Sequence, residues 1–196
     1  MGHTGRSIDL SASESLAGQL LIAMPQMMDE RFERTVIYMC VHNGEGAMGL
    51  VVNKLIDTLS FADMLSQLKI EPGPASDDMP VHFGGPVESG RGFVLHTDDY
   101  EHEGTLHVDD GLSLTSTVDV LKAISDGRGP RRSMLALGYA GWGPGQLESE
   151  IRANGWLHVP ADENLLFDPN CEDKWTLAVA KLGIEPATFS GEAGRA

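Results

Sequence analysis

The chain has 196 residues, 41% of them hydrophobic and 22% charged, which suits one globular domain with a buried core. Its formal net charge of −15 repels nucleic acid and anionic membranes, so direct DNA binding is disfavoured. The two cysteines, Cys40 and Cys171, form no Cys-x-x-Cys motif and give no indication of zinc or redox chemistry. No apolar run is long enough to cross a membrane, so we expect a cytoplasmic protein without cofactor, metal or membrane contact.

The polar residues 1–15 are predicted to be a mobile N-terminal lead-in, and residues 191–196 a tail. Residues 16–190 are predicted to form a single domain, for which an arrangement in two lobes is the alternative. No internal repeat is present in the sequence.

Apolar spacing and turn residues predict the elements in chain order. Strands are expected at 19–23, 35–41 and 47–53, the last two as a hairpin. A helix at 60–68, capped by Ser60, precedes short strands at 81–83, 92–96, 105–108 and 112–115. The remaining elements are a helix at 117–126 after a Ser116 cap, strands at 133–137 and 156–159, and helices at 146–153 and 173–182. These irregularly alternating elements predict an α+β protein with a mixed sheet.

The segment LGYAGWGPGQLESEI at 137–151 places glycines between a predicted strand and a predicted helix. Such a loop can hold a phosphate on free N–H groups, line a pocket for a small ligand, or form a tight turn that lets Trp142 pack. The spacing differs from the dinucleotide motif, no Walker lysine follows, and Glu148 lies in the first helical turn. A tight strand-to-helix turn is the interpretation that these residues favour. Other residues of this segment that could line a pocket are Gly138, Tyr139, Gly141 and Gln146.

A second glycine-rich bend, His82-Phe-Gly-Gly-Pro-Val87, contains Gly84, Gly85 and Pro86. It is interpreted as a β-bend, with an anion-binding nest of N–H groups as the alternative. His42 and His96 are candidate functional histidines, although no pair of histidines has the spacing of a helical metal site.

Several stretches together resemble the AlgH/YqgE family of bacterial proteins. They are DERFER at 29–34, HNGEGAMGLVVN at 42–53, GGPV at 84–87 followed by GFVLH at 92–96, and LGYAGW at 137–142 leading through QLESE to NGW at 154–156. The resemblance covers about residues 16–190 and implies a curved, partly barrel-like mixed β-sheet with about four flanking helices. It implies no catalytic residues, because the family has no agreed activity. Leu55 departs from the family, which often has a proline shortly after the residue equivalent to Asn53.

Three functions follow as hypotheses. The first is a cytoplasmic, non-enzymatic regulatory or interaction protein with a protein partner. The second is a small-molecule-binding protein or unrecognised enzyme, in which the bends at 84–87 and 138–145 line one pocket near Tyr139, Trp142, His42 and Asn53. The third is direct regulation of transcription on DNA, which some family members carry as a label. The net charge and the absence of a helix-turn-helix disfavour it.

Overall fold

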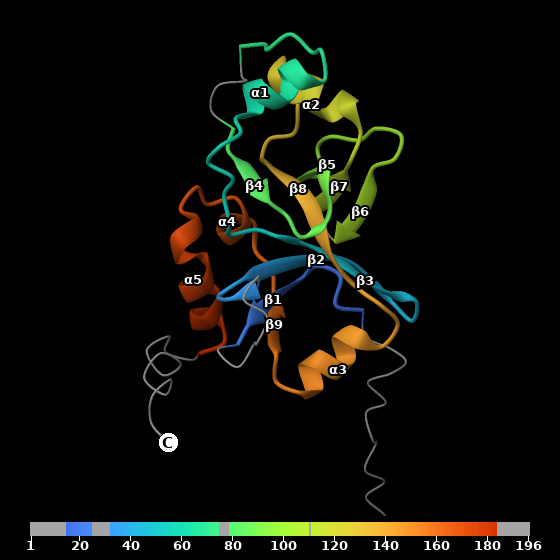
Figure 1. Cartoon of the computed structure of the whole chain (residues 1–196), viewed down its shortest axis with the longest axis vertical. Helices are drawn as coiled ribbons and strands as arrows, with labels where there is room; N and C mark the ends of the chain where they lie inside the picture. The colour runs from blue at the N-terminus through green and yellow to red at the C-terminus, as the bar shows by residue number, and fades with distance from the viewer. Residues whose placement is uncertain (1–14, 25–31, 75–78, 110, 184–196) are drawn as a thin grey trace, which may run out of the picture.

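The computed structural model describes residues 15–24, 32–74, 79–109 and 111–183, drawn in Figure 1. The predicted lead-in (except Ser15) and tail lie outside these ranges. Within them the chain has nine strands and five α-helices, which confirms the predicted α+β class. The strands are β1 (Gln19–Ala23), β2 (Val36–Asn43), β3 (Gly46–Val51), β4 (Val81–Phe83), β5 (Val87–Thr97), β6 (Leu106–Asp109), β7 (Leu112–Thr115), β8 (Ser133–Trp142) and β9 (Trp156–Pro160). The helices are α1 (Phe61–Gln67), α2 (Val118–Ser125), α3 (Gln146–Arg152), α4 (Glu163–Leu166) and α5 (Lys174–Lys181), with a 3₁₀ turn, η2 (Cys171–Asp173).

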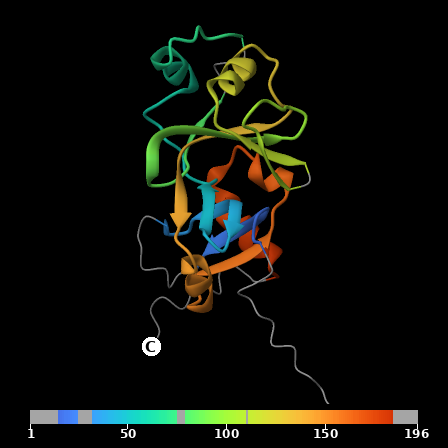
Figure 2. The same cartoon turned by 90° about the vertical axis from the view of Figure 1, so that its right-hand side faces the viewer.

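One curled, half-barrel sheet contains all nine strands (Figure 2). Its order is β6-β7-β5-β8-β3-β2-β1-β9, with antiparallel neighbours, and β4 joins β8 as the one parallel pair in the described chain. The predicted hairpin is confirmed as β2 and β3. The curved mixed sheet that the family resemblance implied is therefore present.

Strand β8 connects the upper and lower groups of strands in Figure 1. It pairs with β5 as far as Tyr139, and its last residues then pair with β3, as in the register of Ala47 with Trp142. The prediction that the strand ends at residue 137 is wrong. Pairing with β3 keeps the glycine-rich residues extended, so the turn before α3 is confined to 143–145.

The two glycine-rich bends cross each other at main-chain distance. A Cβ atom on Gly84 would lie 2.3 Å from the carbonyl oxygen of Gly138, and one on Gly85 would lie 2.0 Å from the carbonyl carbon of Tyr139. Gly138 has a φ of +74°, and its own Cβ would lie 2.3 Å from the Gly85 oxygen. Because no side chain fits at these distances, packing alone requires glycine on both strands.

The helix caps explain where the helices begin. Ser60 and Asp63 form the predicted start of α1 as a complete capping box. The predicted Ser116 cap of α2 is wrong: the cap residue is Thr117, and the Ser116 hydroxyl instead accepts a bond from Arg91. Helix α4 was not predicted, because its four residues are too short to show a helical period.

Helices cover both ends of the sheet (Figure 1). Beneath α1 and α2, one apolar cluster is built around Phe61, Leu65 and Val120, and the largest cluster joins the sheet to α4 and α5 through Leu166 and Trp175. A third cluster, beside α3, contains Trp142, Leu147 and Trp156. Buried tryptophans thus pack against the sheet in two clusters: Trp175 with α4 and α5, and Trp142 and Trp156 beside α3.

The glycine crossing generates a stability prediction. Gly85→Ala should lower the free energy of unfolding by about 2 kcal/mol or more, because the new methyl group would overlap the Tyr139 main chain. Gly90→Ala is the matched control, because its Cβ would meet no atom within 4 Å. Urea denaturation of both variants checks this, and equal stability of the two would contradict it.

Candidate functional site

An open cleft of about 610 Å³ lies between the β2–β3 hairpin and the adjoining parts of β5 and β8. Figure 2 shows this hairpin beside the lower half of β8. The side chains that line the cleft are apolar on its walls and charged at its rim. They include Val41, Met48, Val87, Phe93 and Tyr139 on the walls and Glu45, Glu88 and Arg91 at the rim.

The walls of the cleft are held by packing within the fold. Phe93 is buried and contacts Tyr139 edge to face, with ring centroids 5.8 Å apart. Arg91 lies over the Phe93 ring at 5.0 Å and forms a 3.6 Å ion pair with Glu88. Val87 is 37% exposed, although it lies in a strand. The cleft therefore presents a preformed surface to solvent on which apolar side chains lie beside polar and charged ones.

Some of the predicted site residues line this cleft, and the others make contacts that hold the fold together. Tyr139, Gly141 and Trp142 line the cleft. The crossing glycines do not line it, but Val87 enters the cleft directly after the exposed Pro86. Residues from both bends thus reach one concavity, while the glycines serve the close main-chain contact behind it.

His42 connects three segments of the chain. Its Nδ1 accepts the Leu16 N–H at 2.9 Å, so Nε2 carries the proton that is donated to the Glu148 carboxylate at 2.5 Å. This bond from His42 is the largest cause that lowers the pKa of Glu148. Since both ring nitrogens are occupied, His42 attaches α3 to the hairpin and is not free to act as a base.

Glu150 serves two indoles beside the cleft. Its Oε1 accepts Nε1–H of Trp156 at 3.0 Å and of Trp142 at 3.3 Å, and its Oε2 accepts the Gln146 amide at 3.1 Å. Gln146 in turn accepts the N–H of Gly143 at 3.0 Å. The polar residues of the segment at 137–151 are therefore occupied in holding α3 and the turn against the sheet.

This network predicts the effect of removing Glu150. Glu150→Ala should lower the free energy of unfolding by about 2 kcal/mol or more, because two largely buried indole N–H groups lose their acceptor. The exposed Glu172→Ala should change it little. Urea unfolding followed by tryptophan fluorescence distinguishes them, and an unchanged midpoint for Glu150→Ala would show that the indoles need no partner.

Asn53 and His96 are also occupied within the fold. The Asn53 side chain accepts the Val36 N–H and donates to the Arg34 carbonyl, both at 2.9 Å, and so fixes the start of β2. His96 is fully buried in β5, where one ring nitrogen contacts the Thr97 carbonyl and the other the Thr115 hydroxyl, each at 2.7 Å. Burial is the main cause that lowers the pKa of His96. Neither residue lines the cleft.

His82, in β4, is buried like His96. Its Nδ1 lies 3.1 Å from the Leu135 carbonyl, which makes Nδ1 the donor, and its Nε2 lies 3.4 Å from the Cys171 thiol. Burial, and next the charge of Lys174, lower the pKa of His82 to about 4. The imidazole is therefore neutral near pH 7.

The neutral His82 makes stability depend on pH. The unfolded chain takes up this proton near the ordinary pKa of 6.5, whereas the folded chain does so only near 4. Stability should therefore fall by about 3 kcal/mol as pH decreases through this window, and the loss from this group should level off below it. His82→Gln should flatten this dependence, while His158→Gln, at an exposed histidine, should leave it. Unfolding free energies measured from pH 7 to 4 check the sign; an unchanged slope in His82→Gln would contradict it.

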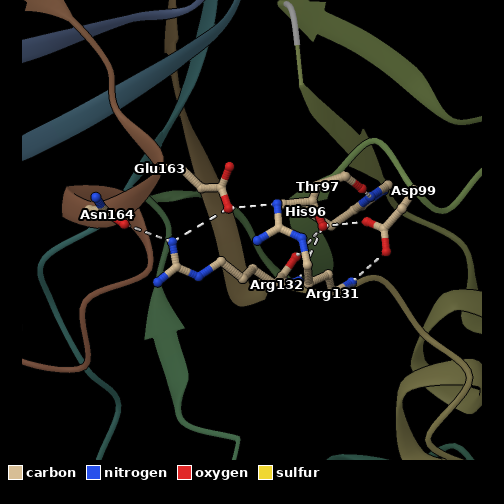
Figure 3. A network of polar contacts seen from close by, with 7 residues as sticks. All are labelled: His96, Thr97, Asp99, Arg131, Arg132, Glu163 and Asn164. Atoms are coloured by element: carbon tan, nitrogen blue, oxygen red, sulfur yellow. Dashed lines mark hydrogen bonds and ion pairs between the residues drawn. The ribbon is translucent and has the colours of Figure 1, made fainter.

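The densest basic cluster of the sequence is neutralised by acidic neighbours. Arg128 pairs with Asp126 at 2.9 Å, and Arg131 and Arg132 both contact Glu163 of α4, at 2.8 and 3.4 Å. Figure 3 shows these two arginines converging on that carboxylate. They connect the loop before β8 to the lower part of the fold and do not form an unneutralised basic surface.

Asp99 completes this network on the side of β5 (Figure 3). Its carboxylate accepts the Thr97 hydroxyl and the N–H of Arg131, the latter at 2.8 Å. The bond from Thr97 is the first of the causes that hold the pKa of Asp99 below its ordinary value. The end of β5 and the start of β8 are thus fixed to each other.

Sequence reasoning missed that β5 begins at Val87 and brings Glu88 and Arg91 to the rim of the cleft. Val87 and Arg91 lie in a strand that the sequence predicted only from residue 92, because exposed residues there interrupt the apolar pattern. A bulge in the pairing of β5 with β8, between Val87 and Gly92, accounts for this interruption.

Within the described ranges, metal-ligand clusters and membrane-spanning helices are both absent. No three His, Cys, Asp or Glu side chains in them come together as metal ligands. No helix in the same ranges is long and apolar enough to span a bilayer.

The fold and the site define a class of protein, an α+β half-barrel with an open apolar cleft beside one hairpin. Residues 20–187 match the family model described as AlgH-like. A UPF0301 protein of Rhodospirillum rubrum is 57% identical over 181 residues, which cover 92% of this chain and 94% of that protein. One from Rhodopseudomonas palustris is 52% identical over 200 residues, covering 98% and 92%. The chain belongs to the AlgH-like (UPF0301) family.

Solved structures agree with this membership. The solution structure of AlgH from Pseudomonas aeruginosa matches with a TM-score of 0.79 and 42% identity, covering 95% of this chain and 98% of that one. A crystal structure of a Corynebacterium diphtheriae protein matches with a TM-score of 0.68 at 21% identity, over 84% and 86% of the chains, and supports the fold alone. These names state no reaction, ligand or partner, so function has to be inferred from the site.

Proposed function

We propose that the protein is a cytoplasmic, non-enzymatic interaction protein of a regulatory kind, and that its cleft binds a short extended segment of a partner protein. The observation that carries this proposal is the group of partly exposed apolar side chains on the walls of the open cleft. Val41, Met48, Val87 and Tyr139 are only partly buried there, although they lie on rigid strands. Preformed apolar surface next to a hairpin is typical of peptide-binding grooves.

The charge of the rim indicates the chemistry of the segment. Glu45 and Glu88 lie at the rim, and the one rim arginine, Arg91, is already paired with Glu88. The whole chain has a net charge of −15. An apolar side chain flanked by Lys or Arg therefore fits the cleft better than an acidic segment does.

The state of the histidines favours binding over catalysis. His42 and His96 each use both ring nitrogens in bonds within the fold. Neither lines the cleft, so neither is placed to move a proton for a bound molecule.

The other two hypotheses have less support. The cleft volume of about 610 Å³ lies in the range of small-molecule pockets, but the cleft is open to solvent on a broad side. Binding to DNA requires free basic residues, and Arg128, Arg131 and Arg132 are paired with Asp126 and Glu163.

Selection of binders from a library of short random peptides tests the proposal. We expect recovered peptides to contain an apolar residue beside Lys or Arg, and Val87→Asp to weaken their binding about tenfold or more by placing a charge on the cleft wall. Leu106→Asp is the matched control, because Leu106 is also a strand residue with 41% exposure but lies outside the cleft. It should bind as the unaltered protein does.

Other outcomes would contradict the proposal. Equal binding by Val87→Asp and the unaltered protein would place the peptide site elsewhere. A thermal-shift screen with nucleotides and sugar phosphates tests the small-molecule alternative, since a ligand of the folded state raises the melting temperature. If a ligand raises the melting temperature of the unaltered protein but not that of Val87→Asp, and no peptide is selected, the cleft binds a small ligand and not a protein partner.

A further inference from the structure

Lys174 is an unusually placed lysine at the start of α5. Its side chain belongs to a residue only 1% exposed, and its Nζ donates to the carbonyl oxygens of Val52 at 2.9 Å and Leu166 at 2.8 Å. Among the described residues, no carboxylate lies within 4.0 Å of this nitrogen. Burial of an ammonium that has no carboxylate in direct contact is costly, so the environment shifts Lys174 toward the free amine.

The two hydrogen bonds fit a free amine. An ammonium has three N–H donors, whereas a neutral amine has two donors and one lone pair. Val52 and Leu166 use two donors, which leaves the third position of Nζ for the lone pair. Burial is the largest cause that lowers the pKa of Lys174, while Cys171 and Asp168 oppose it. The unprotonated fraction of such a lysine is a nucleophile.

A small cavity lies beside Lys174. It has a volume of about 100 Å³ and is lined by Lys174, His82, Asp168 and Ser133, among others. The exposed Pro80 and Pro169 also line it, so the cavity reaches the surface. Its volume equals about three water molecules, which suits a molecule of about three non-hydrogen atoms.

We propose that Lys174 is a covalent attachment site for a small, uncharged aldehyde, which it holds in this cavity as a reversible imine. The Nζ lone pair attacks the carbonyl carbon and a C–N bond forms. The carbonyl oxygen takes up two protons and leaves as water, while the nitrogen gives up two. Amine and aldehyde thus give imine and water, with no oxidant or reductant.

The neighbouring groups support this step and select the ligand. Asp168 lines the cavity and can move the protons, and its negative charge disfavours anionic carbonyl compounds such as oxo acids. His82 has its Nδ1 on Leu135 and its Nε2 on the Cys171 thiol, so it adds no cation beside the amine near pH 7.

Reductive trapping on the full chain tests the proposal. The folded protein is treated with limiting acetaldehyde and cyanoborohydride, and ethylation of each lysine is quantified by peptide mass spectrometry. We expect Lys174 to be labelled several-fold faster than the exposed Lys69 and Lys122, although it is buried. In urea this preference should disappear, and benzaldehyde, which is too large for the cavity, should label only the exposed lysines.

The opposite order of lysine reactivity would overturn the proposal. If Lys174 is the slowest lysine to react in the folded protein, burial only protects it and the proposal is wrong. Asp168→Asn should slow the labelling of Lys174 without changing that of Lys69, and an unchanged rate would remove Asp168 from the step. The unaltered protein, labelled in buffer and in urea, decides the main point without any variant of Lys174. The cavity shares no lining residue with the cleft, so either proposal can fail alone.

Discussion

The main-chain crossing of Gly84 and Gly85 with Gly138 and Tyr139 is the constraint on which the remaining structure depends. Because the two backbones meet without side chains between them, β8 can leave β5 and continue along β3 in one strand. That continuity makes one half-barrel out of two groups of strands. Where the chain segments separate after the crossing, Val87 and Tyr139 remain partly uncovered, and the cleft lies there.

Most residues that line the cleft lie within the stretches that identify the family, among them Met48, Phe93 and Tyr139, but the polar groups beside them serve the scaffold. Trp156 and Gln146 bond to Glu150, and His42 bonds to Glu148, so the polar groups of the glycine-rich segment hold α3 in place. Phosphate binding is an unnecessary explanation for its glycines, since packing already requires Gly138. Arg131 and Arg132, before β8, also serve the fold, because their ion pairs with Glu163 attach α4.

Much of the fold could be predicted from the sequence because local patterns determine it. Ser60 and Asp63 mark a helix start by their own side chains, and the hairpin around 42–46 follows from turn residues between β-branched runs. The extension of β8 could not be predicted, because only the distant β3 makes residues such as Gly141 a strand. For the site, Tyr139 and Trp142 were predicted from their glycine-rich context. Lys174 was missed, since its burial results from Val52 and Leu166 rather than from its own helix.

We propose that the cleft, and not the histidines or the crossing glycines, is the binding surface of this fold. Mapping of backbone amide shifts by NMR during titration with a peptide selected for binding tests this claim most directly. We predict that the largest shifts occur at Met48, Val87 and Arg91, which line the cleft, while the amides around the buried His96 stay unchanged. Saturable shifts confined to residues outside the cleft, with Met48 and Val87 unmoved, would contradict the account.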